Sequence, residues 1–219
     1  MSKNNRLLFK KGFWARLPII SRTSINKRNR WRLKNKSFSI ISSNCTGGVI
    51  YHDLGLRFDS PFINLYILPD DYLKLLHNLP MYLAAEMTEE RDTDCEFPVG
   101  RLLDIHIYFK HYSSFAEAVT KWNERKKRIN YDNLFVLFCD RDGCSMEHIK
   151  IFEQLPFAHK VCFTHVKYPQ FKSTVYIKGF DHDKQIGVIT DYKHPRLKVR
   201  YLDAFDYVKW LNCKKGSEV

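Results

Sequence analysis

The chain has 219 residues, a length that suits one α/β domain with an extension. Its hydrophobic fraction of 44% and aromatic fraction of 15% exclude a disordered or low-complexity protein. No apolar run approaches the roughly 20 residues of a membrane-spanning helix, so we expect no transmembrane segment. The six cysteines contain no C-x-x-C pair, which excludes a zinc ribbon and favours reduced thiols over a disulfide framework.

The positive charge is concentrated at the N-terminus. The formal net charge is +12, and residues 1–36 hold six lysines, six arginines and no acidic residue. Phe, Trp, Leu and Ile are interleaved with these cations, a composition that suits the surface of an anionic membrane. Nucleic acid is the less favoured partner, and a solvated tail is a further alternative. We therefore predict a basic amphipathic arm over residues 1–36 and a single α/β domain over 37–219.

Short apolar segments alternate with helical patterns in the first half of the domain. The predicted elements are, in chain order, a strand at 38–42, a turn at 43–48 with a helix continuing to 54, a strand at 62–67, a helix at 69–76 and an acidic surface loop at 86–98. The strands are recognised as buried apolar runs, and Pro69 marks a helix start because proline suits the first helical turn.

The second half of the domain continues this alternation. The predicted elements are a strand at 102–109, a helix at 115–129, a strand at 134–138, a helix at 145–155, a strand at 160–164, a hairpin of 175–177 with 186–190, and a closing helix at 203–211. Ser114 and Glu117 have the spacing of a capping box, which supports the first of these helices. The pattern predicts an α/β fold with three layers, a mostly parallel sheet, helices on both faces and the basic N-terminal extension.

Polar residues gather at three strand ends, where open α/β sheets bind their ligands. The first group follows the first strand and comprises Ser43, Asn44, Cys45, Thr46, Gly47 and Gly48, with Tyr51 in the helix behind it. Glycines let a backbone approach a ligand, and the N–H groups at a helix start suit an anion or an oxyanion. Cys45 is a candidate nucleophile with His111, His106 or His165 as its base; the alternative is a small buried residue in a tight turn.

The second group is the Asp140-Arg141-Asp142-Gly143 segment after the strand at 134–138. Two carboxylates spaced in this way could hold a divalent cation on a nucleotide diphosphate, and Arg141 could pair with a phosphate or carboxylate. The same residues are also common in turns and at helix caps.

The third group surrounds the strand at 102–109. Arg101, Asp104, His106 and Tyr108 are followed by His111, so this strand end offers acid–base groups and a cation. An exposed strand with one polar face is the alternative interpretation.

Several long stretches resemble a bacterial family of unknown function whose members are often labelled exopolysaccharide or capsule biosynthesis proteins. They are FSIISSNCTGGVIYHDLG, SPFINLYILPDDYLKLLHNL, PVGRLLDIHIYFKHYSSFAEAVTKWNERKKRIN and YDNLFVLFCDRDGCS, within residues 37–212. The Asn44-Cys45 turn is also similar to a turn in a capsule-biosynthesis family proposed to contain acyltransferases. The resemblance implies a bacterial cytoplasmic protein, peripheral at the inner membrane face, that acts on surface glycans.

We expect a transferase in surface-polysaccharide biosynthesis that moves an acyl group to a sugar hydroxyl. Cys45, His111 and Asp142 are the predicted catalytic residues, and a glycan or lipid-linked sugar is the expected acceptor. The sequence leaves the cofactor open: an acyl-CoA donor is one candidate, and a divalent metal is a candidate under the glycosyl-transfer alternative. The predicted substrate-binding residues are Ser43, Asn44, Gly47, Gly48, Tyr51, Arg101, Asp104, Asp140 and Arg141. The alternatives are a metal-dependent glycosyl- or sugar-phosphate transferase and a non-catalytic glycan- or nucleotide-binding module.

Overall fold

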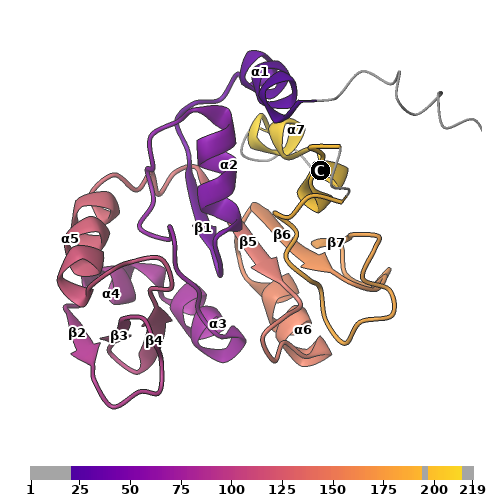
Figure 1. The fold of residues 1–219 in the computed structure, drawn as a ribbon. Helices are drawn as coiled ribbons and strands as arrows, with labels where there is room; N and C mark the ends of the chain where they lie inside the picture. The colour runs from indigo at the N-terminus through magenta and orange to yellow at the C-terminus, as the bar shows by residue number, and fades with distance from the viewer. Residues whose placement is uncertain (1–20, 194–196, 214–219) are drawn as a thin grey trace, which may run out of the picture.

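A four-stranded parallel sheet forms the centre of the molecule (Figure 1). The computed structural model describes residues 21–193 and 197–213, so the first 20 residues of the predicted arm lie outside the described residues. The strands of this sheet are β1 (Ser39–Ser42), β5 (Leu134–Cys139), β6 (His159–Thr164) and β7 (Thr174–Tyr176), in the order β1-β5-β6-β7. All three pairings are parallel, which confirms the predicted mixed α/β class with a parallel sheet.

The two helices whose starts the sequence predicts from Ser114 and Pro69 begin at those positions. The helices are α1 (Arg22–Arg32), α2 (Thr46–Leu54), α3 (Pro69–His77), α4 (Leu79–Ala84), α5 (Phe115–Lys126), α6 (Met146–Gln154) and α7 (Tyr207–Leu211), with a 3₁₀ helix at Tyr201–Ala204. The Ser114 side chain accepts a hydrogen bond from the backbone N–H of Glu117 and so caps α5. Pro69 is at the start of α3, as predicted.

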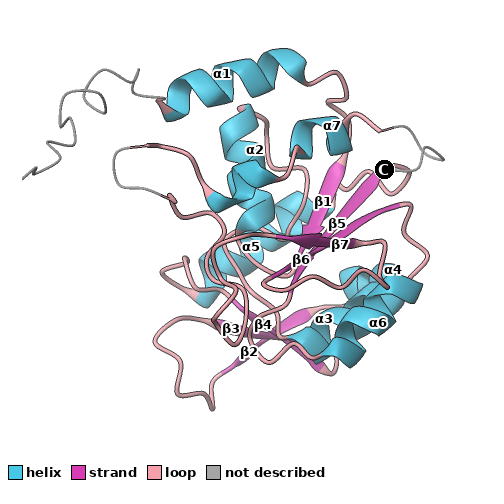
Figure 2. Cartoon of the chain, turned by 90° about the vertical axis from the view of Figure 1, so that its right-hand side faces the viewer, coloured by secondary structure: helices cyan, strands magenta, loops and turns pink. Residues whose placement is uncertain are grey.

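Both faces of the parallel sheet are buried, because its strands alternate their side chains between two apolar clusters. Ile41, Val136 and Phe138 belong to a cluster that includes residues of α3, α4, α5 and α6. Ile40 and Phe135 belong to a second cluster, which includes residues of α2 and α7. Figure 2 shows the strands between α2 and α7 on one side and α3, α4 and α6 on the other.

The strand predicted at 102–109 is shorter than expected and belongs to a small antiparallel sheet. Its strands are β2 (Met87–Glu90), β3 (Val99–Leu102) and β4 (Ile105–Tyr108), in the order β2-β3-β4. The chain reverses at Leu103 and Asp104, and Leu103 adopts a φ of 58°, which is typical of tight hairpin turns. The alternating pattern therefore belongs to β4, and β3 was not predicted. The acidic loop predicted at 86–98 contains β2.

Two other strand predictions are wrong for reasons of backbone geometry. Residues 62–67 are largely buried but form only one bridge, between Tyr66 and Tyr108, because Asn64 has a φ of 61° that interrupts an extended chain. Residues 186–190 form no hairpin with β7, which pairs with β6 in parallel instead. The backbone N–H of Ile186 donates to Asp140 rather than to a strand.

The second half of the predicted basic arm is a helix that packs on the domain. The Arg22 side chain binds Asp53 and Asp203, and Asn29 donates to the Tyr207 hydroxyl at 2.9 Å. The sequence predicts an arm separate from the domain here, but these contacts make α1 part of the folded structure.

Candidate functional site

A pocket of about 780 Å³ lies at the carboxyl ends of β1 and β5. The lining residues are Asn44, Cys45, Thr46, Tyr66, Leu68, Phe97, Lys110, His111, Cys139, Arg141, Asp142, Gly187, Val188, Ile189 and Thr190. The fold thus brings together five of the predicted site residues, namely Asn44, Cys45, His111, Arg141 and Asp142. This edge of a parallel sheet is also where ligands bind most often in α/β proteins.

The start of α2 forms one wall of the pocket. The Asn44 side chain accepts a hydrogen bond from the Thr46 N–H at 3.0 Å and donates to the Cys139 thiol at 3.2 Å, so it links β1, β5 and α2. Gly47 packs against β1, where an added Cβ would meet Ile40 and Ser42 atoms at 3.0 Å each. Gly47 therefore allows α2 to approach the sheet, an added Cβ at Gly48 would meet Ile63 at 3.4 Å, and neither glycine lines the pocket.

Cys45 lines the pocket as a thiol rather than a thiolate. Burial raises the pKa of Cys45, and the nearby charges of Lys110 and Arg141 oppose that rise without cancelling it. Its sulfur lies 3.7 Å from the carbonyl oxygen of Leu65, to which it can donate. A raised pKa disfavours the predicted nucleophilic role of this residue.

We expect the Cys45 thiol to react with iodoacetamide at neutral pH several times more slowly than the Cys95 thiol in the surface segment before β3. The physical reason is the small thiolate fraction that follows from a raised pKa. Peptide mass spectrometry after timed alkylation measures both rates, and the Cys45 rate should keep rising with pH beyond the range of an ordinary cysteine. Faster alkylation of Cys45 at neutral pH would restore the nucleophile hypothesis.

Positive charge and aromatic surface occupy the other walls. Both Lys110 and Arg141 are close enough to act electrostatically on Cys45, and Arg141 Nε lies 3.0 Å from Asp142 Oδ2. Tyr66 stacks on Tyr108 with ring centroids 4.6 Å apart, beside Phe97. The pocket thus joins two cations and a helix N-terminus, which suit an anion, to an aromatic wall that suits a ring.

His111 is the histidine that the fold places at the pocket. It is exposed and follows β4, next to Lys110. His106, the second base considered from sequence, lies within 3.7 Å of Asp71 and Glu90 on the small sheet, outside the pocket lining.

Asp140 lies outside the pocket lining and holds neighbouring backbone segments in place. Its side chain is only 3% exposed, Oδ2 accepts from the backbone N–H of His165 at 3.0 Å and from Nδ1 at 2.6 Å, and Oδ1 accepts from the Ile186 N–H at 3.0 Å. Burial raises the pKa of this carboxyl. Both oxygens are therefore engaged, and the Ile186 bond holds the start of the segment that lines the pocket at 187–190.

These contacts do not favour a metal held jointly by Asp140 and Asp142. Asp142 adopts a φ of 58°, its N–H donates to Gln185, and its carboxylate faces Arg141. Within residues 21–193 and 197–213, no group of three His, Cys, Asp or Glu side chains has the arrangement of a metal site.

Four more predicted binding residues lie outside the pocket lining. Ser43 is buried, and the Tyr51 hydroxyl donates to the Phe38 carbonyl inside the core. Arg101 lies in β3 and Asp104 in the turn that follows it, where Asp104 accepts a hydrogen bond from the Tyr82 hydroxyl at 2.7 Å. The polar groups of Tyr51 and Asp104 bind other parts of the protein.

Sequence reasoning missed Lys110, the two aromatic side chains and the 187–190 segment. Lys110 had a usable signal, since it lies next to His111 just after a strand. The segment at 187–190 had none, because its position depends on the long-range bond between Ile186 and Asp140.

A second hollow contains a serine, a histidine and an aspartate in hydrogen-bond contact. Ser145 Oγ lies 2.9 Å from His148 Nδ1, and His148 Nε2 lies 2.9 Å from Asp70 Oδ1. The Ser145 N–H also donates to Nδ1, and Ser145 Oγ caps α6. These bonds are those of a capping box, and they explain the cluster as the start of a helix.

Comparison with known proteins identifies the family. Residues 18–212 match a domain of unknown function, DUF1919. The chain belongs to the DUF1919 family. An uncharacterised protein of Haemophilus influenzae is 45% identical over 199 residues, which cover 87% of this chain and 96% of the relative. The match to DUF1919 confirms the resemblance to a bacterial family of unknown function, and it extends to residues of α1 that the resemblance had left outside.

In the part of this DUF1919 protein that the structure describes, the helices are too short or too polar to span a bilayer.

Proposed function

We propose that this DUF1919 protein is a transferase of bacterial surface-polysaccharide assembly, which moves an acyl group from a phosphate-bearing donor to a sugar hydroxyl. The observation that carries the proposal is the composition of the pocket at the carboxyl edge of the parallel sheet. It combines the α2 N-terminus, Lys110 and Arg141 with an aromatic wall and an exposed histidine. An acyl-CoA has matching parts, because it carries phosphates, an adenine ring and a reactive thioester.

Each part of the pocket has a role in this reaction. Lys110 and Arg141 bind donor phosphates, while Tyr66 and Phe97 contact an apolar or ring portion of a substrate. The N–H groups in the first turn of α2 other than that of Thr46, which is bonded to Asn44, stabilise the negative charge that develops on the thioester oxygen. Cys45 is a contact residue in this scheme, since its raised pKa does not suit a nucleophile.

His111 is proposed as the general base. It removes the proton from the acceptor hydroxyl as that oxygen bonds to the acyl carbon. The carbon–sulfur bond then breaks, and His111 returns the proton to the leaving thiolate. An exposed position at the pocket edge suits this role, because both the hydroxyl and the base must reach the donor.

The glycosyl-transfer alternative differs in its donor and in its need for a metal. The engaged carboxylate of Asp140 gives that alternative less support than the acyl-transfer scheme. A binding module would use the same pocket without turnover. We place the protein at the inner membrane face, as the family resemblance and the basic N-terminal segment suggest.

We expect His111→Gln to lower acyl transfer from acetyl-CoA to a surface-polysaccharide acceptor by about 100-fold or more. Binding of acetyl-CoA, measured by calorimetry, should change less than about twofold, because the substitution leaves both cations in place. His106→Gln is the matched control, since it removes a histidine outside the pocket lining. Equal transfer by the His111 variant would contradict the assignment. Transfer from a nucleotide sugar would favour the glycosyl alternative, and binding without turnover would favour the module.

A further inference from the structure

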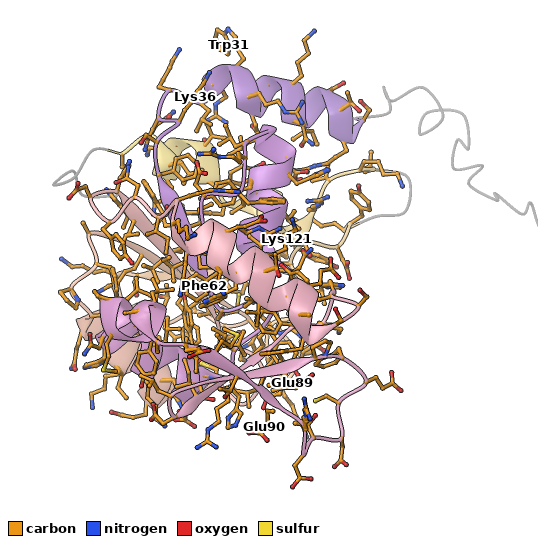
Figure 3. The ribbon with its side chains drawn as sticks, turned by 90° about the vertical axis from the view of Figure 1, so that its left-hand side faces the viewer. Trp31, Lys36, Phe62, Glu89, Glu90 and Lys121 are labelled. Carbon is orange, nitrogen blue, oxygen red and sulfur yellow. The ribbon has the colours of Figure 1, made fainter. Side chains whose placement is uncertain are left out.

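The outward face of α1 presents a row of cations around an exposed tryptophan. Trp31 is 78% exposed, the highest value among the large hydrophobic side chains of the described residues. Lys27 and Arg28 are four and three residues before it, a spacing that places all three on one helical face, and Lys34 follows just after the end of the helix. Figure 3 shows Trp31 at the outer edge of the molecule, with Lys36 nearby.

These outward cations have no acidic partner in the described part of the chain. The hydrogen bonds and ion pairs of α1 to acidic side chains use Arg22, Asn26 and Arg32, which face the domain. Lys27, Arg28 and Lys34 make no such bond there, and α1 itself contains no acidic residue. Lys34 Nζ lies 5.7 Å from the centre of the Trp31 ring, so the charge and the aromatic surface form one patch.

The inward face of α1 fixes the orientation of this patch. Asn26 and Asn29 are buried and bind Asp53 and Tyr207, and Arg30 Nε donates to the carbonyl of Asp53 at 2.9 Å. A helix held on one side by these bonds presents its other side as a rigid surface. Rigid presentation lowers the entropy lost when the surface binds a partner.

The patch and the pocket are at opposite ends of α2. Asp53 is in the last turn of α2, whereas Cys45 and Thr46 line the pocket at its start. A helix of nine residues spans about 13 Å at 1.5 Å per residue. Figure 1 shows α1 next to one end of α2 and α3 beyond the other end.

We propose that the outward face of α1 is a docking surface for anionic phospholipid headgroups. Lysine and arginine near such a surface are attracted to the lipid phosphates, and tryptophan favours the boundary between headgroups and acyl chains. Nucleic acid is less suitable, because single strands are held by grooves with several stacked aromatics, while this patch is a convex helix with one exposed ring. Docking through α1 places the pocket at the end of α2 away from the bilayer.

The orientation of the pocket relative to the bilayer adds to the proposed function. It rests on that proposal only for the identity of the substrates. A pocket away from the bilayer receives the acyl-CoA donor from water, and the acceptor sugar must extend from the membrane to reach it. Because the α1 patch and the pocket share no residues, vesicle binding and acyl transfer can fail separately.

The test is co-sedimentation of the full chain with vesicles of phosphatidylcholine, with and without phosphatidylglycerol. We expect binding only to the anionic vesicles, and we expect Lys27→Glu with Arg28→Glu to weaken it by more than about tenfold. Trp31→Ala should weaken it several-fold without changing the charge. Lys150→Glu with Lys172→Glu is the matched control, because it reverses two exposed lysines outside α1 and should have a much smaller effect.

Unchanged vesicle binding by both α1 variants would overturn the proposal. Equal losses in the α1 and control double variants would also overturn it, since net charge alone would then explain the binding. Loss of oligonucleotide binding in the α1 variants, with vesicle binding intact, would assign the surface to nucleic acid instead. Circular dichroism of each variant checks that the fold is retained.

Discussion

Replacing Asp53 by alanine is expected to lower the free energy of unfolding by about 3–5 kcal/mol. Asp53 is 1% exposed and accepts hydrogen bonds from Arg22, Arg200 and Asn26, so it joins α1 and the C-terminal segment to α2. Its removal leaves two largely buried guanidinium groups without a shared carboxylate. Urea unfolding followed by circular dichroism measures the loss.

Asp59→Ala is the control for this prediction. Asp59 pairs with the exposed Arg57 at 2.8 Å, and such surface pairs contribute about 1 kcal/mol or less. Hydrogen exchange adds a local readout. The amides of α1 should exchange faster than in the wild type in the Asp53 variant and at the wild-type rate in the Asp59 variant. Equal stability of the two variants would show that the buried ion cluster does not hold α1 in place.

The same cluster shows why the sequence did not predict the packing of α1 on the domain. A run of arginines and lysines without acids predicts an arm separate from the domain, because the local sequence offers no acidic partner. The partners of Arg22 are Asp53 and Asp203, which are 31 and 181 residues away. Local composition carries no information on such contacts.

The parts of the fold that were predicted depend on local signals. The cap at Ser114 and the proline at residue 69 mark helix starts within a few residues of chain. The apolar runs of β1, β5 and β6 are buried on both faces, so they form continuous patterns. The hairpin at Leu103 was missed because β3 does not alternate between buried and exposed side chains, whereas β4 does.

The candidate site was also predicted only in part. Asn44, Cys45, Arg141 and Asp142 were predicted together because the carboxyl ends of neighbouring parallel strands meet at one edge. The fold removed Gly47, Tyr51 and Arg101 from this set, because packing and turns use polar and small residues as well as ligands do. Site residues were thus predictable where the order of the strands brings them together. They were not predictable where the side chain could bind either a neighbouring residue or a ligand.

Removing the charge of Arg141 is expected to weaken binding of acetyl-CoA by about ten- to hundredfold. Arg141→Gln keeps a long polar side chain but removes a charged donor from the pocket wall. It also leaves the Asp142 carboxylate without its partner at 3.0 Å, so a negative charge would then face the donor phosphates. Lys110→Gln should have a smaller effect, because Lys110 is more exposed and its charge is better screened by water.

Calorimetry over a range of salt concentrations separates this charge effect from a loss of structure. Wild-type binding should weaken as salt is added, and the slope should be smaller for Arg141→Gln, because fewer charges remain to be screened. Arg101→Gln is the matched control, since it removes an exposed arginine from the β3–β4 hairpin outside the pocket and should leave affinity and slope unchanged. If the Arg141 and Arg101 variants bind equally well, the phosphates lie elsewhere and the pocket does not hold a phosphate-bearing donor in the way proposed.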